Sequence, residues 1–279
     1  MDGHIAKISK LFIINSLLFV ALIFLLPKNT ISNAYAATDC ASIVMNADTL
    51  DILKGEHYHI RLPMASTTKI MTALLICENC LPNEKIKIPK EAVGIEGSSL
   101  YLKEGETLTI KDLLYGLMLR SGNDCAVALA LHLGENINNF AEMMNLRAQS
   151  LGLNDTHYVN PHGLHDKDHY TSAYDLCKLG CIAMRNPLFK EIVSTKITTI
   201  GVEDNKRTIT NKNKILTQYE GGNGIKTGFT RAAGRCLVSA AERNNVQLVA
   251  AVLNIPDMFG VCSDLMDYGF SVIKNKSLK

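Results

Sequence analysis

The sequence has almost no net charge. Its 29 Lys and Arg residues are nearly balanced by 27 Asp and Glu residues, which leaves a formal charge of +2. This excess of positive charge comes from residues 1–36, which contain Lys7, Lys10 and Lys28 but only one acidic residue, Asp2. The remainder of the chain is therefore neutral. Because nucleic acids are bound through basic patches, the composition argues against a nucleic-acid partner.

Internal repeats and low-complexity linkers are also missing. Their absence excludes a solenoid and gives no sign of domains joined by a flexible tether. With 279 residues, of which 47% are hydrophobic, the chain can bury one large core or two subdomains. Disorder is excluded for the same reason.

A metal-hydrolase signature is missing as well, because the chain has no His-Glu-x-x-His. Polar residues do crowd one loop, but their spacing fits no familiar hydrolase; they are His157, His162, His165, His169, Asp155, Asp166 and Asp168. Cys77-x-x-Cys80 and Cys177-x-x-x-Cys181 could together ligate zinc, but these spacings are loose. We therefore expect no metal and no cofactor.

The first residues resemble an export signal. Basic Lys7 and Lys10 precede sixteen mainly apolar residues from Leu11 to Leu26, and Ala34-Tyr35-Ala36 has the small-x-small pattern that signal peptidase cleaves. We expect residues 1–36 to be a signal peptide and residues 37–279 to be exported, either to the cell envelope at the extracytoplasmic face of the membrane or as a secreted protein. An uncleaved anchor stays open, because sixteen residues fall only slightly short of the roughly 20 that span a bilayer.

All eight cysteines lie after the leader. Export and an even number favour disulfides. However, a chain of this length needs no cross-links, and Cys125, Cys177, Cys181 and Cys236 lie inside apolar helix or strand patterns. We expect buried free thiols.

The stretch Ser66-Thr67-Thr68-Lys69 precedes an apolar run from Ile70 to Ile76 and predicts a helix start. Residues three apart share a helix face, so the Ser66 hydroxyl and the Lys69 amine should lie within hydrogen-bond reach. The first turn also leaves backbone N–H groups free. A nucleophile, a base and oxyanion donors are what acyl transfer needs. The motif alone is weak, because Ser271 to Lys274 repeats it.

Two companion motifs follow in a fixed order. Ser121-Gly122-Asn123 is the only Ser-x-Asn of the chain, and Lys226-Thr227-Gly228 is the only Lys-Thr-Gly. With these motifs the sequence resembles the low-molecular-mass penicillin-binding D-alanyl-D-alanine carboxypeptidases, within the serine β-lactamase and transpeptidase-like group. The likeness runs from about residue 41 to about residue 270. It includes the segments 160–164, 172–176 and 233–237.

The resemblance implies a role for each motif. Ser66 would attack the carbonyl between the two terminal D-alanines of a peptidoglycan stem peptide, with Lys69 as base and Ser121 as proton relay. Asn123 would hold the substrate amide, and Lys226 and Thr227 would receive its terminal carboxylate. Gly228 would let the substrate approach. The backbone N–H groups of Ser66 and Phe229 would form the oxyanion hole; many relatives carry histidine in place of Phe229.

Two other functions stay open. One is a β-lactamase, although residues 154–170 contain no glutamate to activate the deacylating water, as the commonest class requires. The other is a catalytically silent protein that binds peptidoglycan or senses penicillin. The resemblance implies a stem peptide ending in D-Ala-D-Ala as substrate and β-lactams as inhibitors. Many relatives continue into a β-rich domain and a membrane-lying helix, so membrane attachment is uncertain.

Strand patterns at both ends of the chain enclose a helical middle. This predicts an α/β (α+β) fold, with an α/β part formed by residues 40–65 and 195–279, a helical part formed by residues 66–194, and the site at their junction. The expected strands are 42–45, 50–53, 195–200, 206–210, 225–230, 236–241 and 246–253. Thr109-x-x-Asp112 and Ser172-x-x-Asp175 predict helix starts. The resemblance implies an antiparallel sheet flanked by helices, with an inserted all-helical subdomain.

Overall fold

The computed structural model describes residues 39–202 and 206–277. The predicted signal peptide or anchor, residues 1–36, lies outside them. Among the helices of these two ranges, none combines the length and the apolar character needed to cross a membrane.

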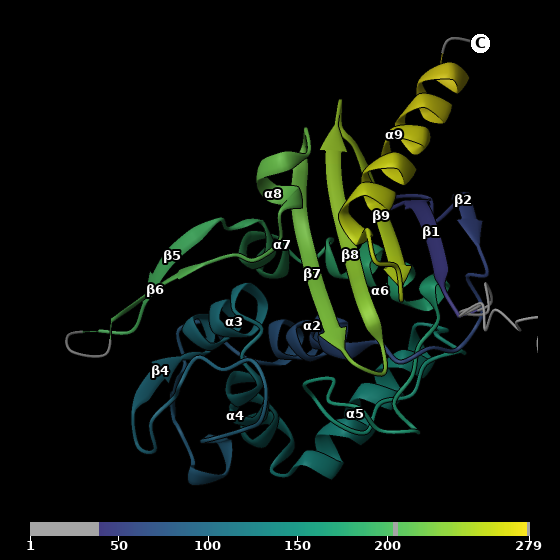
Figure 1. The fold of residues 1–279 in the computed structure, drawn as a ribbon. Helices are drawn as coiled ribbons and strands as arrows, with labels where there is room; N and C mark the ends of the chain where they lie inside the picture. The colour runs from purple at the N-terminus through teal and green to yellow at the C-terminus, as the bar shows by residue number, and fades with distance from the viewer. Residues whose placement is uncertain (1–38, 203–205, 278–279) are drawn as a thin grey trace, which may run out of the picture. The chain divides into compact units, whose positions relative to one another are not determined.

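A five-stranded antiparallel sheet, in the order β2-β1-β9-β8-β7, forms the centre of the fold (Figure 1). Its strands are β1 (Ala41–Asn46), β2 (Ile52–Glu56), β7 (Gly222–Thr230), β8 (Gly234–Arg243) and β9 (Val246–Leu253). The first and last parts of the sequence therefore meet in one sheet, as predicted. β7 is the terminal strand on one side, and this edge borders the site.

Both faces of the sheet are covered by helices, which explains why β9 is apolar almost throughout. Its side chains alternate between the two sides. Val249, Ala251 and Leu253 belong to the larger core with the middle helices, and Leu248, Ala250 and Val252 pack against α9 (Met258–Ser277). Figure 1 shows α9 in front of the sheet and α6 (Ala173–Ala183) behind it. The predicted sheet flanked by helices is confirmed.

Helices dominate the middle of the chain. They are η1 (Ala65–Thr68), α2 (Lys69–Asn79), η2 (Lys90–Ala92), α3 (Ile110–Leu119), α4 (Asn123–Gly134), α5 (Ile137–Ser150), α6 and α7 (Pro187–Ser194); a short α8 (Ile215–Gln218) comes later. Thr109 and Ser172 begin α3 and α6 as predicted, since their side chains accept hydrogen bonds from the backbone N–H groups of Asp112 and Asp175.

Two small sheets accompany the main one. β3 (Lys85–Lys87) pairs with β4 (Thr107–Thr109) inside the predicted helical part, and β5 (Ile197–Ile200) pairs with β6 (Arg207–Thr210) away from the main sheet. Arg207 fixes the second hairpin through two hydrogen bonds of 2.8 and 2.9 Å to the buried carboxylate of Glu106. Residues 38–279 form one compact unit, so the boundaries between an α/β part and a helical part stay a prediction.

The eight cysteines are free, and five of them are buried, including the four that were expected inside helices or strands. The strand expected at residues 225–230 starts earlier than predicted, because β7 already begins at Gly222. A bulge between Gly222 and Gly224 lets these glycines join the sheet.

Candidate active site

Ser66 lies on the tight turn η1 that leads into α2, half-buried. The Thr68 hydroxyl closes this turn by donating to the carbonyl oxygen of Ala65 at 2.8 Å. A Cβ atom on Gly163 would lie 1.9 Å from the same carbonyl oxygen, so only glycine lets the loop of residues 154–170 pack against the turn. The serine is thus held on a backbone that is fixed from two sides.

The Lys69 side chain is fully buried beside this serine. Its Nζ atom lies 3.1 Å from Ser66 Oγ, 2.7 Å from Asn123 Oδ1 and 2.5 Å from the carbonyl oxygen of His162. Burial, and then the nearby charge of Lys226, lower the pKa of Lys69 well below its ordinary value. The predicted contact between Ser66 and Lys69 is present.

The three contacts of Lys69 suit a neutral amine that acts as a base. A neutral amine has two N–H bonds and one lone pair. The two shortest contacts end on carbonyl oxygens, which can only accept, so they take the N–H bonds. The third partner, the Ser66 hydroxyl, can donate, so the lone pair of Lys69 is left to receive its proton.

Ser121 lies in the short turn between α3 and α4, and Asn123 is the first residue of α4. Ser121 is nearly buried and has a φ of 64°. The Asn123 side chain is positioned at both ends, because its oxygen accepts from Lys69 and its NH2 group donates to the carbonyl oxygen of Glu96 at 2.5 Å. Its rotamer is therefore determined by the site.

The histidine-rich loop of residues 154–170 is held by hydrogen bonds to the serine turn and within itself. His169 Nδ1 accepts from the backbone N–H of Val159 at 3.1 Å, so the ring proton is on Nε2 and donates to Thr68 Oγ1 at 2.7 Å. Burial lowers the pKa of His169 to about 4 and that of His162 to about 3, so both rings are neutral near pH 7. Within residues 39–202 and 206–277, no three His, Cys, Asp or Glu side chains are placed to hold a metal ion.

The Lys226-Thr227-Gly228 segment lies on β7 at the free edge of the sheet. Lys226 is only 2% exposed, and its amine donates to the carbonyl oxygen of Thr227 at 2.8 Å. Burial, and then the charge of Lys212, lower the pKa of Lys226 to about 7. Lys226 therefore lies behind the edge strand, whereas Thr227 is partly exposed.

Gly228 brings β7 against the serine turn. A Cβ atom at this position would lie 3.1 Å from the backbone nitrogen of Ser66 and 3.2 Å from the carbonyl oxygen of Met64. Both neighbours are backbone atoms, which cannot rotate away. The next residue, Phe229, has a side chain that is 65% exposed, so it extends away from the packed side of the strand.

These segments enclose a cavity of about 290 Å³. Ser66, Ser98 and Ser121 line it on the helical side, and Thr227, Gly228 and Phe229 line it on the strand side. The remaining lining residues are Lys212, Arg235, Met258 and Phe259. The structure thus brings the three sequence motifs together, with Lys69, Asn123 and Lys226 buried around the cavity rather than lining it.

Replacing Gly228 with alanine should slow acylation of Ser66 by about tenfold. The added methyl group must push β7 away from the serine turn, and overpacking of this kind typically costs about 1–3 kcal/mol. The measurement is the rate constant for labelling by a fluorescent penicillin. An unchanged rate, in a variant that unfolds at the normal temperature, would contradict the close approach described above.

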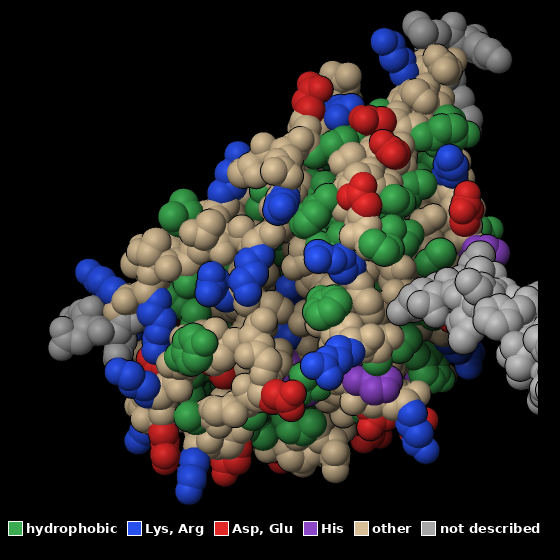
Figure 2. All heavy atoms as spheres, viewed as in Figure 1, with side chains coloured by type: hydrophobic (Ala, Val, Ile, Leu, Met, Phe, Trp, Pro, Cys, Tyr) green, Lys and Arg blue, Asp and Glu red, His purple; other side chains and the backbone are tan. Residues whose placement is uncertain are grey.

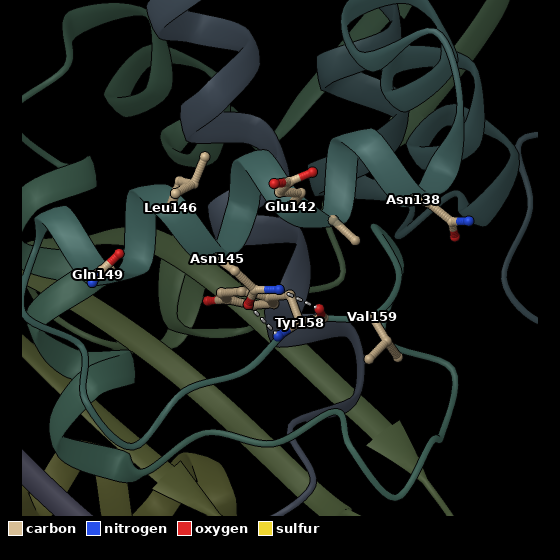
Figure 3. A pocket seen from close by; sticks show the side chains of 8 residues that line it. Asn138, Glu142, Asn145, Leu146, Gln149, Tyr158 and Val159 are labelled. Carbon is tan, nitrogen blue, oxygen red and sulfur yellow. Dashed lines mark hydrogen bonds between the residues drawn. The ribbon is translucent and has the colours of Figure 1, made fainter.

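A second hollow, of about 410 Å³, lies along α5. Figure 3 shows Glu142 and Asn145 on the helix above Tyr158. The Asn145 side chain already exchanges two hydrogen bonds of 2.8 Å with the Tyr158 backbone. Among the described residues that line this hollow there is no serine, cysteine or lysine, so they offer none of the groups that acyl transfer requires.

Several residues around the site had no sequence signal. Asp124 is fully buried and accepts from the backbone N–H groups of Leu100 and Leu102, which fixes the loop beside Asn123. An Asp inside a helical pattern gives no sign of such a role. Lys212 and Arg235 line the cavity although neither belongs to the three motifs, and only the folded chain brings them there.

Comparison with known proteins agrees with this geometry. The D-alanyl-D-alanine carboxypeptidase family model (Peptidase S11) matches residues 28–257. The chain is 32% identical over 245 residues to D-alanyl-D-alanine carboxypeptidase DacF of Bacillus subtilis, covering 83% of this chain and 62% of the relative. It therefore spans less than two thirds of that relative's length.

Two other relatives are covered more fully. The D-alanyl-D-alanine carboxypeptidase of Streptomyces sp. K15 is 34% identical over 249 residues, covering 82% of this chain and 86% of the relative. The crystal structure of a D-alanyl-D-alanine carboxypeptidase from Mycobacterium tuberculosis superposes with a TM-score of 0.79 at 30% identity, covering 83% of this chain and 90% of that one. With the family match and these likenesses, the chain belongs to the D-alanyl-D-alanine carboxypeptidase family, peptidase family S11.

Proposed function

We propose that this protein is a serine-type D-alanyl-D-alanine carboxypeptidase, which removes the terminal D-Ala of peptidoglycan stem peptides through an acyl-enzyme on Ser66. The observation that carries the proposal is the buried amine of Lys69, which lies 3.1 Å from Ser66 Oγ and has a lowered pKa. The family membership and the names of the relatives support the choice of substrate.

Acylation begins when neutral Lys69 takes the proton of the Ser66 hydroxyl. Oγ then attacks the carbonyl carbon of the penultimate D-Ala, and the carbonyl oxygen becomes an oxyanion. We assign its stabilisation to the backbone N–H groups of Ser66 and Phe229, which the close packing at Gly228 supports. The proton passes through Ser121 to the leaving amine, the C–N bond breaks, and D-Ala departs. Water then hydrolyses the ester.

Substrate binding uses the groups that surround the nucleophile. The Asn123 amide, anchored to Lys69 and to Glu96, holds the substrate amide next to the scissile bond. The Thr227 hydroxyl receives the terminal carboxylate, and Lys226 adds positive charge from behind the strand. No cofactor is needed for this chemistry.

The location of the enzyme follows from its substrate. We propose that residues 37–279 work in the cell envelope, on the outer side of the membrane, after export by the leader. Peptidoglycan lies there, and the family acts on it. β-Lactams should react with Ser66 as substrate mimics.

The proposed activity can be tested with diacetyl-L-Lys-D-Ala-D-Ala. The purified protein should release one D-alanine per peptide, measured by a coupled amino-acid oxidase assay. Stoichiometric penicillin labelling without any release of D-alanine would instead establish a silent penicillin-sensing protein. Rapid catalytic opening of a chromogenic cephalosporin would establish a β-lactamase.

Penicillin should leave the enzyme far more slowly than the D-alanyl acyl group does. The loop of residues 154–170 contains no glutamate, and its buried rings, His162 and His169, are neutral and already hydrogen-bonded. The bulky penicilloyl ester therefore lacks a group that primes water against it. Recovery of activity after removal of free penicillin measures this step, and recovery within seconds would contradict the prediction.

A further inference from the structure

Two exposed cations line the catalytic cavity, Lys212 and Arg235. Arg235 lies on β8 directly opposite Phe229 on β7, and side chains of such a pair share one face of the sheet. Thr227, two residues before Phe229, has its side chain on that same face. A diagonal cross-strand neighbour lies within reach of a long side chain, so the Arg235 guanidinium can extend toward the Thr227 hydroxyl.

The Arg235 guanidinium has no protein partner among the described residues. Several other arginines of the fold do have partners, for example Arg207 with Glu106 and Arg243 with Asp267. Within residues 39–202 and 206–277, no ion pair or side-chain hydrogen bond involves Arg235, and its exposed side chain lines the cavity. Figure 2 shows Lys and Arg side chains gathered across the middle of the face that carries the lower half of β7 and β8 in Figure 1, with few acidic side chains among them.

The surroundings of Arg235 also favour an anionic ligand. Met258 and Phe259, at the start of α9, line the same cavity, and an apolar wall weakens the screening of a charge pair by water. A guanidinium presents two parallel N–H groups that match the two oxygens of a carboxylate. In contrast, the Lys226 amine is buried behind β7 and donates to a backbone carbonyl.

We propose that Arg235 directly binds the free carboxylate of the substrate's C-terminal residue, together with the Thr227 hydroxyl, and thereby restricts the enzyme to chain ends. This inference rests on the proposed carboxypeptidase function. In it, Arg235 is a specificity-determining residue: it contacts the leaving residue and takes no part in the proton transfers at Ser66.

The test compares two peptides, diacetyl-L-Lys-D-Ala-D-Ala and the same peptide amidated at its C-terminus. Arg235→Gln should lower kcat/KM for the free acid by about tenfold, the low end of the range for a hydrogen bond to a charged group because the arginine is partly solvated. Its kcat/KM for the amide should stay within about twofold of wild type. Arg235→Lys should recover part of the lost kcat/KM for the free acid, because lysine keeps the positive charge but lacks the two parallel N–H groups of the guanidinium.

Arg231→Gln is the matched control. Arg231 is an exposed arginine in the turn between β7 and β8, four residues from Arg235, and it does not line the cavity. The substitution Arg231→Gln removes the same positive charge four residues away in the sequence, so it measures how much the loss of charge alone changes the rates. It should leave the ratio of acid to amide rates unchanged. The acidic limb of the pH–rate profile should be unchanged in Arg235→Gln as well.

Three results would overturn the inference: Arg235→Gln keeps the full preference for the free acid, Arg231→Gln lowers it equally, or Lys212→Gln removes it while Arg235→Gln does not. These results differ from a failure of the proposed function. In that case the wild-type protein itself would release no D-alanine from the free acid.

Discussion

Ser66→Ala should abolish covalent labelling by penicillin and reduce release of D-alanine by about four to six orders of magnitude, as expected when a catalytic nucleophile is removed. Ser66 is the serine whose hydroxyl faces the buried amine of Lys69, at 3.1 Å. Without Oγ no ester can form. Intact-mass spectrometry after incubation with labelled penicillin, followed by peptide mapping of the wild type, measures the result.

The sequence offers a matched control for this experiment. Ser271 and Lys274 repeat the Ser-x-x-Lys spacing on α9, but the Ser271 hydroxyl is exposed and donates to the carbonyl oxygen of Tyr268 at 2.7 Å. Ser271→Ala should label like the wild type. Stoichiometric labelling of Ser66→Ala, or a label mapped to Ser121 or Ser271, would show that the nucleophile is another residue.

Lys226→Gln should lower kcat/KM for the free-acid peptide by about ten- to 150-fold, the range for a lost interaction with a charged group, and by more where Lys69 is also affected. The side chain keeps most of its length and loses its charge. Discrimination against the amidated peptide should weaken at the same time, because the positive charge behind Thr227 is gone.

The pH profile separates the two effects of Lys226. Lys69 accepts a proton only when it is neutral, so activity falls as the pH drops through its pKa. The charge of Lys226 lowers the pKa of Lys69; removing it raises that pKa and should move the acidic limb of kcat/KM to higher pH. A variant with an unmoved acidic limb and the full preference for a free carboxylate would exclude both roles.

The strands and helix starts that could be predicted from the sequence are those that depend on residues close together in the chain. Nearly continuous apolar runs predict β8 and β9, and the turn between them falls at Asn244 and Asn245, whose φ angles of 50° and 62° suit asparagine. Thr109 and Ser172 reveal their helix starts because capping is local. β7 begins earlier than predicted because Gly222 and Gly224, which read as loop residues, are held in the sheet by pairing with β8.

The candidate active site likewise has a part that could be predicted from local spacing and a part that could not. Ser66 and Lys69 are one helical turn apart, so their contact follows from spacing, and the companion motifs follow from the family resemblance. The partners that tune them are distant in sequence. His162 supplies a carbonyl oxygen to Lys69 across 93 residues, and His169 reaches Thr68 across 101. Such contacts depend on where the loop of residues 154–170 lies in the folded protein. The spacing of apolar residues along the sequence does not indicate that position.

The strand order has a consequence for the time at which the enzyme becomes active. β1 pairs with β9, and Ala41 lies opposite Leu253. During synthesis, β1 can therefore pair with β9 only after more than 200 further residues have been made. Loops of this size close slowly, and sheets dominated by distant pairings fold late. The serine turn packs against Gly228 on β7, which itself needs β8 and β9 as support. A growing chain therefore has Ser66 and Lys69 long before it has a catalyst, and activity should appear only once the last three strands have joined the sheet.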